Sequence, residues 1–179
     1  YDRAKRAARD LLEAAEEHAT PLMEAHGWNQ LGEIARFEGR WGQAREFYEN
    51  AYEVYERTGS NDRHVVLMNI AFVEMAAGEH VAAGEKFAEL EEIFEEGGWA
   101  RMMPNVYLGM LTCAAGRRQW RVWDEVFERV EAIFAEVDNR ERDHGWLADL
   151  AVEATEESGS GERVEKVRRF ADGLWSELE

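Results

Sequence analysis

The feature that most constrains this chain is a pattern of side chains that recurs about every 40 residues. In each copy a glycine is followed by four core-type residues at relative offsets of 0, 4, 7 and 11, which lie on one stripe of an α-helix. Self-similarity at a fixed spacing predicts a solenoid in which each pair of helices covers the next. The three central copies follow Gly39, Gly78 and Gly116, and their stripes are Ala44, Tyr48, Ala51, Tyr55; Ala83, Phe87, Leu90, Phe94; and Trp123, Phe127, Val130, Phe134.

Weaker copies of the stripe stand near both ends of the chain. The first copy corresponds to the second helix of a pair, so we expect residues 1–179 to form a single helical repeat domain taken from a longer array. The last copy follows a longer turn rich in serine and glycine, as in a degenerate or capping repeat. The two terminal stripes are Ala4, Ala8, Leu11, Ala15 and Val167, Ala171, Leu174, Leu178.

Composition favours an all-α fold. The chain has only two prolines, and β-branched residues never alternate with polar ones, as they would in a half-buried strand.

Thr20 is expected to cap a helix that Pro21 begins, and Gly59 is expected to end a helix in the left-handed conformation. The pattern predicts about nine antiparallel helices, at about residues 2–18, 21–38, 41–57, 62–78, 80–96, 104–116, 119–137, 142–157 and 162–179.

The charge of the chain limits its partners. With 38 Asp and Glu against 21 Lys and Arg, the net charge is −17, which repels nucleic acid and anionic membrane surfaces. The acidity fits either a salt-tolerant, GC-rich organism or a basic partner. There is no apolar run of about 18 residues and only one cysteine, Cys113, so we expect a cytoplasmic protein without a disulfide.

No residue pattern predicts catalysis. The five histidines are scattered without a metal-ligand spacing, and the glycine pairs lack the strand and lysine of a phosphate loop. Glu91-Glu92 is expected to be solvated surface charge. The repeated triplets beginning at His26 and His144 are expected to occupy equivalent surface positions at helix starts. We therefore expect a non-enzymatic chain without metal or cofactor.

The central copy also resembles a known family. Leu31-Gly32, Gly39, Trp41, Ala44, Tyr48 and Ala51 are similar to the signature of the tetratricopeptide repeat (TPR). The spacing of about 40 residues is longer than the usual 34 or so and is similar to long repeats in bacterial signalling kinases and STAND-type regulators. Bulky Trp123 departs from the alanine that the family prefers. The resemblance implies an α-α superhelix, a TPR solenoid.

In that family the first helix of each pair lines a concave groove. The resemblance therefore implies a groove that begins polar and becomes apolar and Met-rich, suited to a peptide or an apolar helix. The alternative is that the methionines pack as ordinary core between helices. The candidate partner-binding residues are Asn29, Glu33, Arg36 and Phe37, then Met68, Phe72 and Met75, then Met103, Val106 and Met110.

The expected function is a non-catalytic scaffold for protein–protein interaction, within a bacterial regulatory or signalling protein. Its partner would be another protein, a peptide or a neighbouring domain of the same protein. Two alternatives remain open. One is a sensor module that binds a small ligand, and the other is the helical scaffold of an enzyme whose catalytic domain lies outside this chain.

Overall fold

The computed structural model describes residues 2–136 and 140–178 and is all-α, with 89% helix. Within these residues there are nine α-helices, one short 3₁₀ helix and no strand. The chain divides into two compact units, residues 1–77 and 78–179. The helices are α1 (Asp2–His18), α2 (Pro21–Phe37), α3 (Trp41–Thr58), α4 (Asp62–Ala76), α5 (His80–Gly97), η1 (Ala100–Met102), α6 (Met103–Gly116), α7 (Trp120–Glu136), α8 (Arg142–Ser158) and α9 (Gly161–Leu178).

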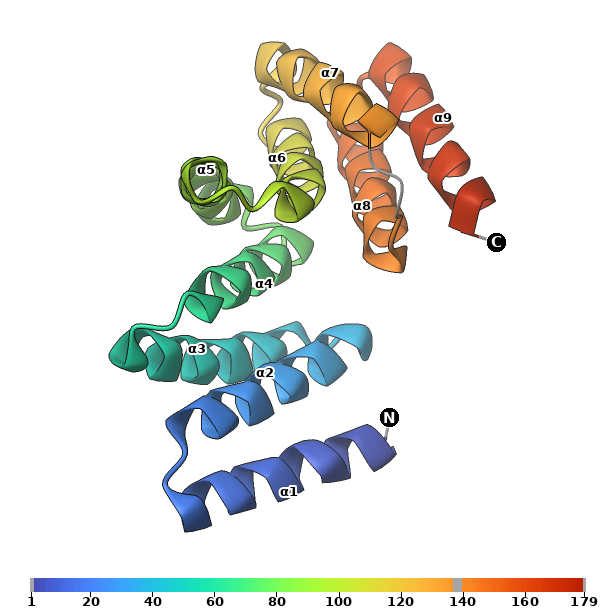
Figure 1. The fold of residues 1–179 in the computed structure, drawn as a ribbon. Helices are drawn as coiled ribbons and strands as arrows, with labels where there is room; N and C mark the ends of the chain where they lie inside the picture. The colour runs from blue at the N-terminus through green and yellow to red at the C-terminus, as the bar shows by residue number, and fades with distance from the viewer. Residues whose placement is uncertain (1, 137–139, 179) are drawn as a thin grey trace. The chain divides into compact units, whose positions relative to one another are not determined.

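In the first unit each helix packs on the next one along the chain. α2 lies between α1 and α3, and α4 packs on α3 (Figure 1). The short connections make neighbouring helices antiparallel, as in a repeat of helical hairpins. The core is built where the stripe of α3 meets α2 and α4, around the fully buried ring of Tyr48.

In the second unit α6 is the central helix. It packs on α5, α7 and α8, and α9 then packs on α8. Twelve of the 14 residues of α6 are buried, and nearly all are apolar or small. A helix that is apolar on every side is stable only when other elements surround it, so α6 must lie inside this unit.

The predicted stripes form the cores of both units. Every residue of the three central stripes is 5% exposed or less. The terminal stripes are weaker, because Ala4 is exposed and Leu11 and Leu178 are half-buried. No described helix combines the length and the apolar character needed to cross a bilayer.

Several helices end as predicted, on a glycine. Gly59 has φ 69°, and Gly39, Gly78, Gly98 and Gly159 also have positive φ. A Cβ atom at any of these five positions would meet no neighbour within 4 Å, so the backbone conformation alone requires glycine there.

Some helix starts differ from the prediction. The hydroxyl of Thr20 does not cap the amides of α2 but donates to the sulfur of Met23 at 3.3 Å, while the carbonyl of Thr20 accepts from the amides of Met23 and Glu24. Pro104 is the second residue of α6 rather than the first, because η1 leads directly into the helix. The predicted end of the seventh helix, at residue 137, lies outside the described residues.

The prediction for His144 was wrong. His26 is exposed, but His144 is 3% exposed, and its Nδ1 accepts a hydrogen bond from the backbone N–H of Glu141 at 3.1 Å. The edge of the imidazole packs against Phe134, with ring centroids 5.2 Å apart. The two triplets are therefore not equivalent, because in the second one the histidine closes the start of α8.

This arrangement predicts a loss of stability in mild acid. Burial lowers the pKa of His144, with Arg140 acting in the same direction and Glu141 and Asp143 opposing it. Because the folded-state pKa lies below the unfolded value of about 6.5, the unfolded chain takes up the proton first. The free energy of unfolding should therefore fall as the pH drops below about 6.5.

Urea titrations of wild type and His144→Gln at about pH 7.5 and about pH 5.5 test this. Glutamine at this position can still accept from the Glu141 N–H but does not titrate. The variant should lose less stability between the two pH values than the wild type does. His26→Gln, on the exposed histidine, is the control and should behave as wild type. Equal acid losses in wild type and His144→Gln would contradict the prediction.

Candidate functional site

The candidate site is a polar network on one side of α2. Glu33 and Arg36 follow Asn29 at offsets of 4 and 7, so all three lie on one face of the helix. Tyr48 reaches this face from α3, and Asn69 reaches it from α4. All five residues belong to the first unit. The structure thus brings together three of the four polar-end residues that the sequence predicts.

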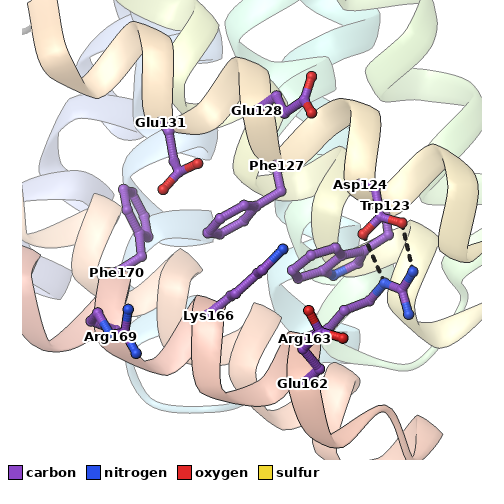
Figure 2. A pocket seen from close by; sticks show the side chains of 10 residues that line it. All are labelled: Trp123, Asp124, Phe127, Glu128, Glu131, Glu162, Arg163, Lys166, Arg169 and Phe170. Atoms are coloured by element: carbon purple, nitrogen blue, oxygen red, sulfur yellow. Dashed lines mark hydrogen bonds and ion pairs between the residues drawn. The ribbon is translucent and has the colours of Figure 1, made fainter.

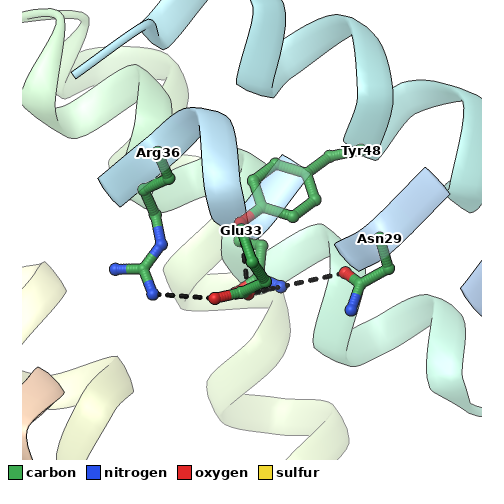
Figure 3. A network of polar contacts seen from close by, with 5 residues as sticks. Asn29, Glu33, Arg36 and Tyr48 are labelled. Atoms are coloured by element: carbon green, nitrogen blue, oxygen red, sulfur yellow. Dashed lines mark hydrogen bonds and ion pairs between the residues drawn. The ribbon is translucent and has the colours of Figure 1, made fainter. Parts of the chain in front are cut away.

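Glu33 is the centre of this network (Figure 3). Its Oε1 accepts from the hydroxyl of Tyr48 and from Nδ2 of Asn69, both at 3.1 Å. Its Oε2 accepts from Arg36 at 3.0 Å. Asn69 also donates to Oδ1 of Asn29 at 3.2 Å. We call these five residues the Glu33 network.

The charges of the network are fixed in place. The Arg36 side chain is 3% exposed and the Glu33 side chain is 32% exposed, so a buried cation is neutralised by a carboxylate that still reaches solvent. Burial, and next the nearby Glu33 charge, raise the pKa of Tyr48 far above its ordinary value. The Tyr48 hydroxyl therefore stays protonated and remains a hydrogen-bond donor to Glu33 at any physiological pH.

The fourth predicted residue of this group, Phe37, lies at the edge of the network. It is 56% exposed, and the guanidinium carbon of Arg36 lies 4.5 Å from the centroid of its ring. This geometry is that of a cation–π contact. A large apolar ring thus stands in solvent directly beside the Glu33 network.

The network leaves hydrogen-bonding capacity unused on its exposed side. A carboxylate offers about four acceptor positions, and Glu33 uses three of them for the donors named above. The amide nitrogen of Asn29 donates to none of the described residues. A partner could therefore place a basic side chain against Glu33 and a backbone carbonyl against Asn29. The described residues contain no group of three His, Cys, Asp or Glu that could hold a metal ion.

The predicted Met-rich strip is not an exposed surface. Five of its six residues are buried, and Met110 is half-buried. For these five side chains, burial favours the alternative that the sequence left open, packing as ordinary core between helices, over an exposed groove face. The sequence left both open because α4 and α6 are apolar around most of their circumference, so their pattern does not distinguish a groove face from a core face. The five buried residues are Met68, Phe72 and Met75 in the first unit and Met103 and Val106 in the second.

Sequence reasoning missed two members of the Glu33 network. Tyr48 was assigned to the core stripe, where its ring does lie, but its hydroxyl extends beyond the stripe to Glu33. Asn69 is an amide within an otherwise apolar stretch of α4 and is 6% exposed. A buried amide requires hydrogen-bond partners, and this was the signal that could have revealed it.

A cleft in the second unit was also not foreseen. It lies between α7 and α9 and has a volume of about 660 Å³ (Figure 2). Arg163 forms two hydrogen bonds with the carboxylate of Asp124, at 2.8 and 2.5 Å, across one end. Lys166 extends from α9 toward the ring of Phe127. Side chains of both charge signs line this cleft, so it favours no single class of ligand.

Neither a family model nor a curated protein matches this sequence. The TPR resemblance therefore remains a prediction from residues.

Proposed function

We propose that this chain is a non-catalytic protein-interaction module of the TPR type, within a bacterial regulatory or signalling protein. The Glu33 network is its contact site, and the partner is a peptide segment of another protein or a neighbouring domain. One observation carries the proposal. A carboxylate held by three donors stays one-third exposed beside the exposed ring of Phe37.

The chemistry of the network selects the kind of segment. Because its donors already hold the Glu33 carboxylate in one position, a partner cation does not have to order it, which lowers the cost of binding. The ring of Phe37 adds an apolar contact of the kind that forms energetic hot spots. We therefore expect a segment with a lysine or arginine followed by an apolar residue.

A selection from a random peptide library tests this proposal. Peptides selected on the wild-type chain should be enriched in Arg or Lys next to an apolar residue. Their affinity should fall at least about tenfold for Glu33→Gln, because a hydrogen bond between charged groups is worth about 1.5–3 kcal/mol. Phe37→Ser should weaken the same peptides, and because Phe37 is exposed its replacement should leave the fold intact.

The matched control is Glu49→Gln, which removes the same charge from an exposed position on α3 that takes part in none of the network's hydrogen bonds. It should leave peptide binding unchanged. If Glu49→Gln weakens the peptides as much as Glu33→Gln does, they respond only to the overall negative charge, and the site is wrong. Peptides without a basic residue would contradict the role given to Glu33.

A further inference from the structure

A cavity in the first unit lies between α1 and α3, with α2 as its floor, and has a volume of about 350 Å³. We call it the α1–α3 pocket. Leu31 and Ile34 form the floor, and Leu12 contributes from α1. Trp28 and Phe47 stack at 5.8 Å between ring centroids and form an aromatic wall. The exposed lining is mostly apolar.

The polar residues of the pocket are unlike the rest of the molecule. Lys5, Arg9 and Arg40 line it, and no carboxylate does, in a chain whose net charge is −17. Glu38, outside the lining, pairs with Lys5 at 2.7 Å and with Arg40. The hydrogen bond from Lys5, and then the contacts with Arg40, lower the pKa of Glu38, so this carboxylate remains ionised.

Arg9 is the cation without such compensation. Its side chain is exposed and forms no ion pair or hydrogen bond with any residue that the structure describes. It stands one helical turn from Lys5 and one turn from Leu12, so α1 presents two cations and an apolar side chain along one face. Among the residues that line the pocket and their ion-pair partners, three cations stand against the single carboxylate of Glu38.

We propose that the α1–α3 pocket binds a small amphipathic carboxylate, with an unbranched apolar chain on the Leu31–Ile34 floor and the carboxylate at Arg9. The volume lies within the range of small-molecule sites, about 300–1,000 Å³, and near its lower end. A protein partner would instead need about 800 Å² of contact on each side. An apolar floor with cations at one edge is complementary to a medium-chain fatty acid, which has an apolar chain and an anionic head.

This pocket is independent of the Glu33 network. Successive residues of a helix are rotated by about 100°, so Trp28 and Leu31 lie about 140° and about 160° around α2 from Glu33, and Ile34 lies about 100° from it. In the larger cleft between α7 and α9, by contrast, Arg163 is paired with Asp124, and further carboxylates line the same walls (Figure 2). A preference for anions therefore belongs to the α1–α3 pocket and not to clefts between helices in general.

Calorimetric titration of the 179-residue chain with a series of ligands tests the proposal. The probes are hexanoate, octanoate and decanoate, each below the concentration at which it self-associates, with octanol and octylammonium as probes of charge. Affinity should rise by up to about fourfold for each added methylene until the pocket is filled. Octanoate should bind more tightly than octanol, and octylammonium should not bind.

Two variants on the same helix locate the site. Arg9→Gln should weaken octanoate by about three- to tenfold and leave octanol unchanged. Arg6→Gln removes the same charge from an exposed position that does not line the pocket, and it should leave octanoate binding unchanged. Neither arginine side chain forms an ion pair with a residue that the structure describes, so both variants should keep the wild-type circular dichroism.

Three results would overturn the proposal. Equal affinity for octanoate and octanol would mean that the cations play no part. Equal weakening by Arg9→Gln and Arg6→Gln would place the carboxylate elsewhere. Absence of saturable carboxylate binding, together with tight binding of a peptide that alternates glutamate and leucine, would assign the pocket to a protein partner. Peptide selection with Glu33→Gln is unaffected by any of these results, so the two proposals fail separately.

Discussion

Replacing Trp123 with alanine is expected to lower the free energy of unfolding by about 3–5 kcal/mol. Trp123 is fully buried and stacks on Phe127, with ring centroids 4.9 Å apart. The guanidinium carbon of Arg163 lies 5.9 Å from the Trp123 ring centroid, so the indole also makes a cation–π contact with α9. Removing it leaves a cavity in the second unit that the surrounding rigid helices cannot fill.

A second substitution at Trp123 separates the loss of the aromatic ring from the loss of the indole N–H. The Nε1–H is buried and has no acceptor among the described residues. Trp123→Phe should therefore cost much less than Trp123→Ala, because it keeps an aromatic ring and removes an unsatisfied donor. Urea denaturation followed by far-ultraviolet circular dichroism measures both. Trp120→Ala, at a half-buried position on the same helix, is the control, and a loss equal to that of Trp123→Ala would contradict the argument.

The second large effect is expected at Gly109, in the middle of α6. A Cβ atom there would lie 2.3 Å from Cζ of Phe87 and within 2.7 Å of two further atoms of the same ring. Phe87 is fully buried and cannot move aside. Overpacking of this kind costs about 1–3 kcal/mol, which outweighs the gain of up to about 1 kcal/mol that alanine brings to a helix interior.

Gly109→Ala should thus destabilise the protein, against helix propensity. The matched control is Gly173→Ala in α9, where a Cβ atom would meet nothing within 4 Å. That variant should stabilise by about 0.5–1 kcal/mol. The double variant Gly109→Ala/Phe87→Leu should be more stable than the sum of its single changes, because the smaller side chain makes room. If Gly109→Ala alone stabilises the protein, α5 and α6 can move apart to admit the added methyl group, and the prediction is wrong.

Predictions from the sequence succeeded where a single helix carries the information. The stripe of α5, for example, is fully buried because its four residues face one direction regardless of what covers them. Helix ends at Gly39 and Gly59 were likewise local, since they depend only on backbone conformation. For the first core position of α8 the sequence pattern fits Trp146 and Leu147 equally, and the structure buries Leu147.

The candidate site depended on information that no single helix holds. Asn29, Glu33 and Arg36 share a face of α2, and spacing predicts that much. Their partners Tyr48 and Asn69 come from other helices, and only the packing of α3 and α4 brings them to Glu33. The α1–α3 pocket is the same kind of feature, because it exists only through the placement of two helices on a third.

The order in which helices pack along the chain also affects the folding rate of the protein. Within each unit, the helices in extensive contact are neighbours in sequence or are separated by one helix. Closing such short loops costs little entropy, and chains dominated by local contacts fold in microseconds to milliseconds. The helices that pack on α2 and α3 all lie within the first 77 residues. The first unit can therefore begin to fold on the ribosome while the second is still being synthesised.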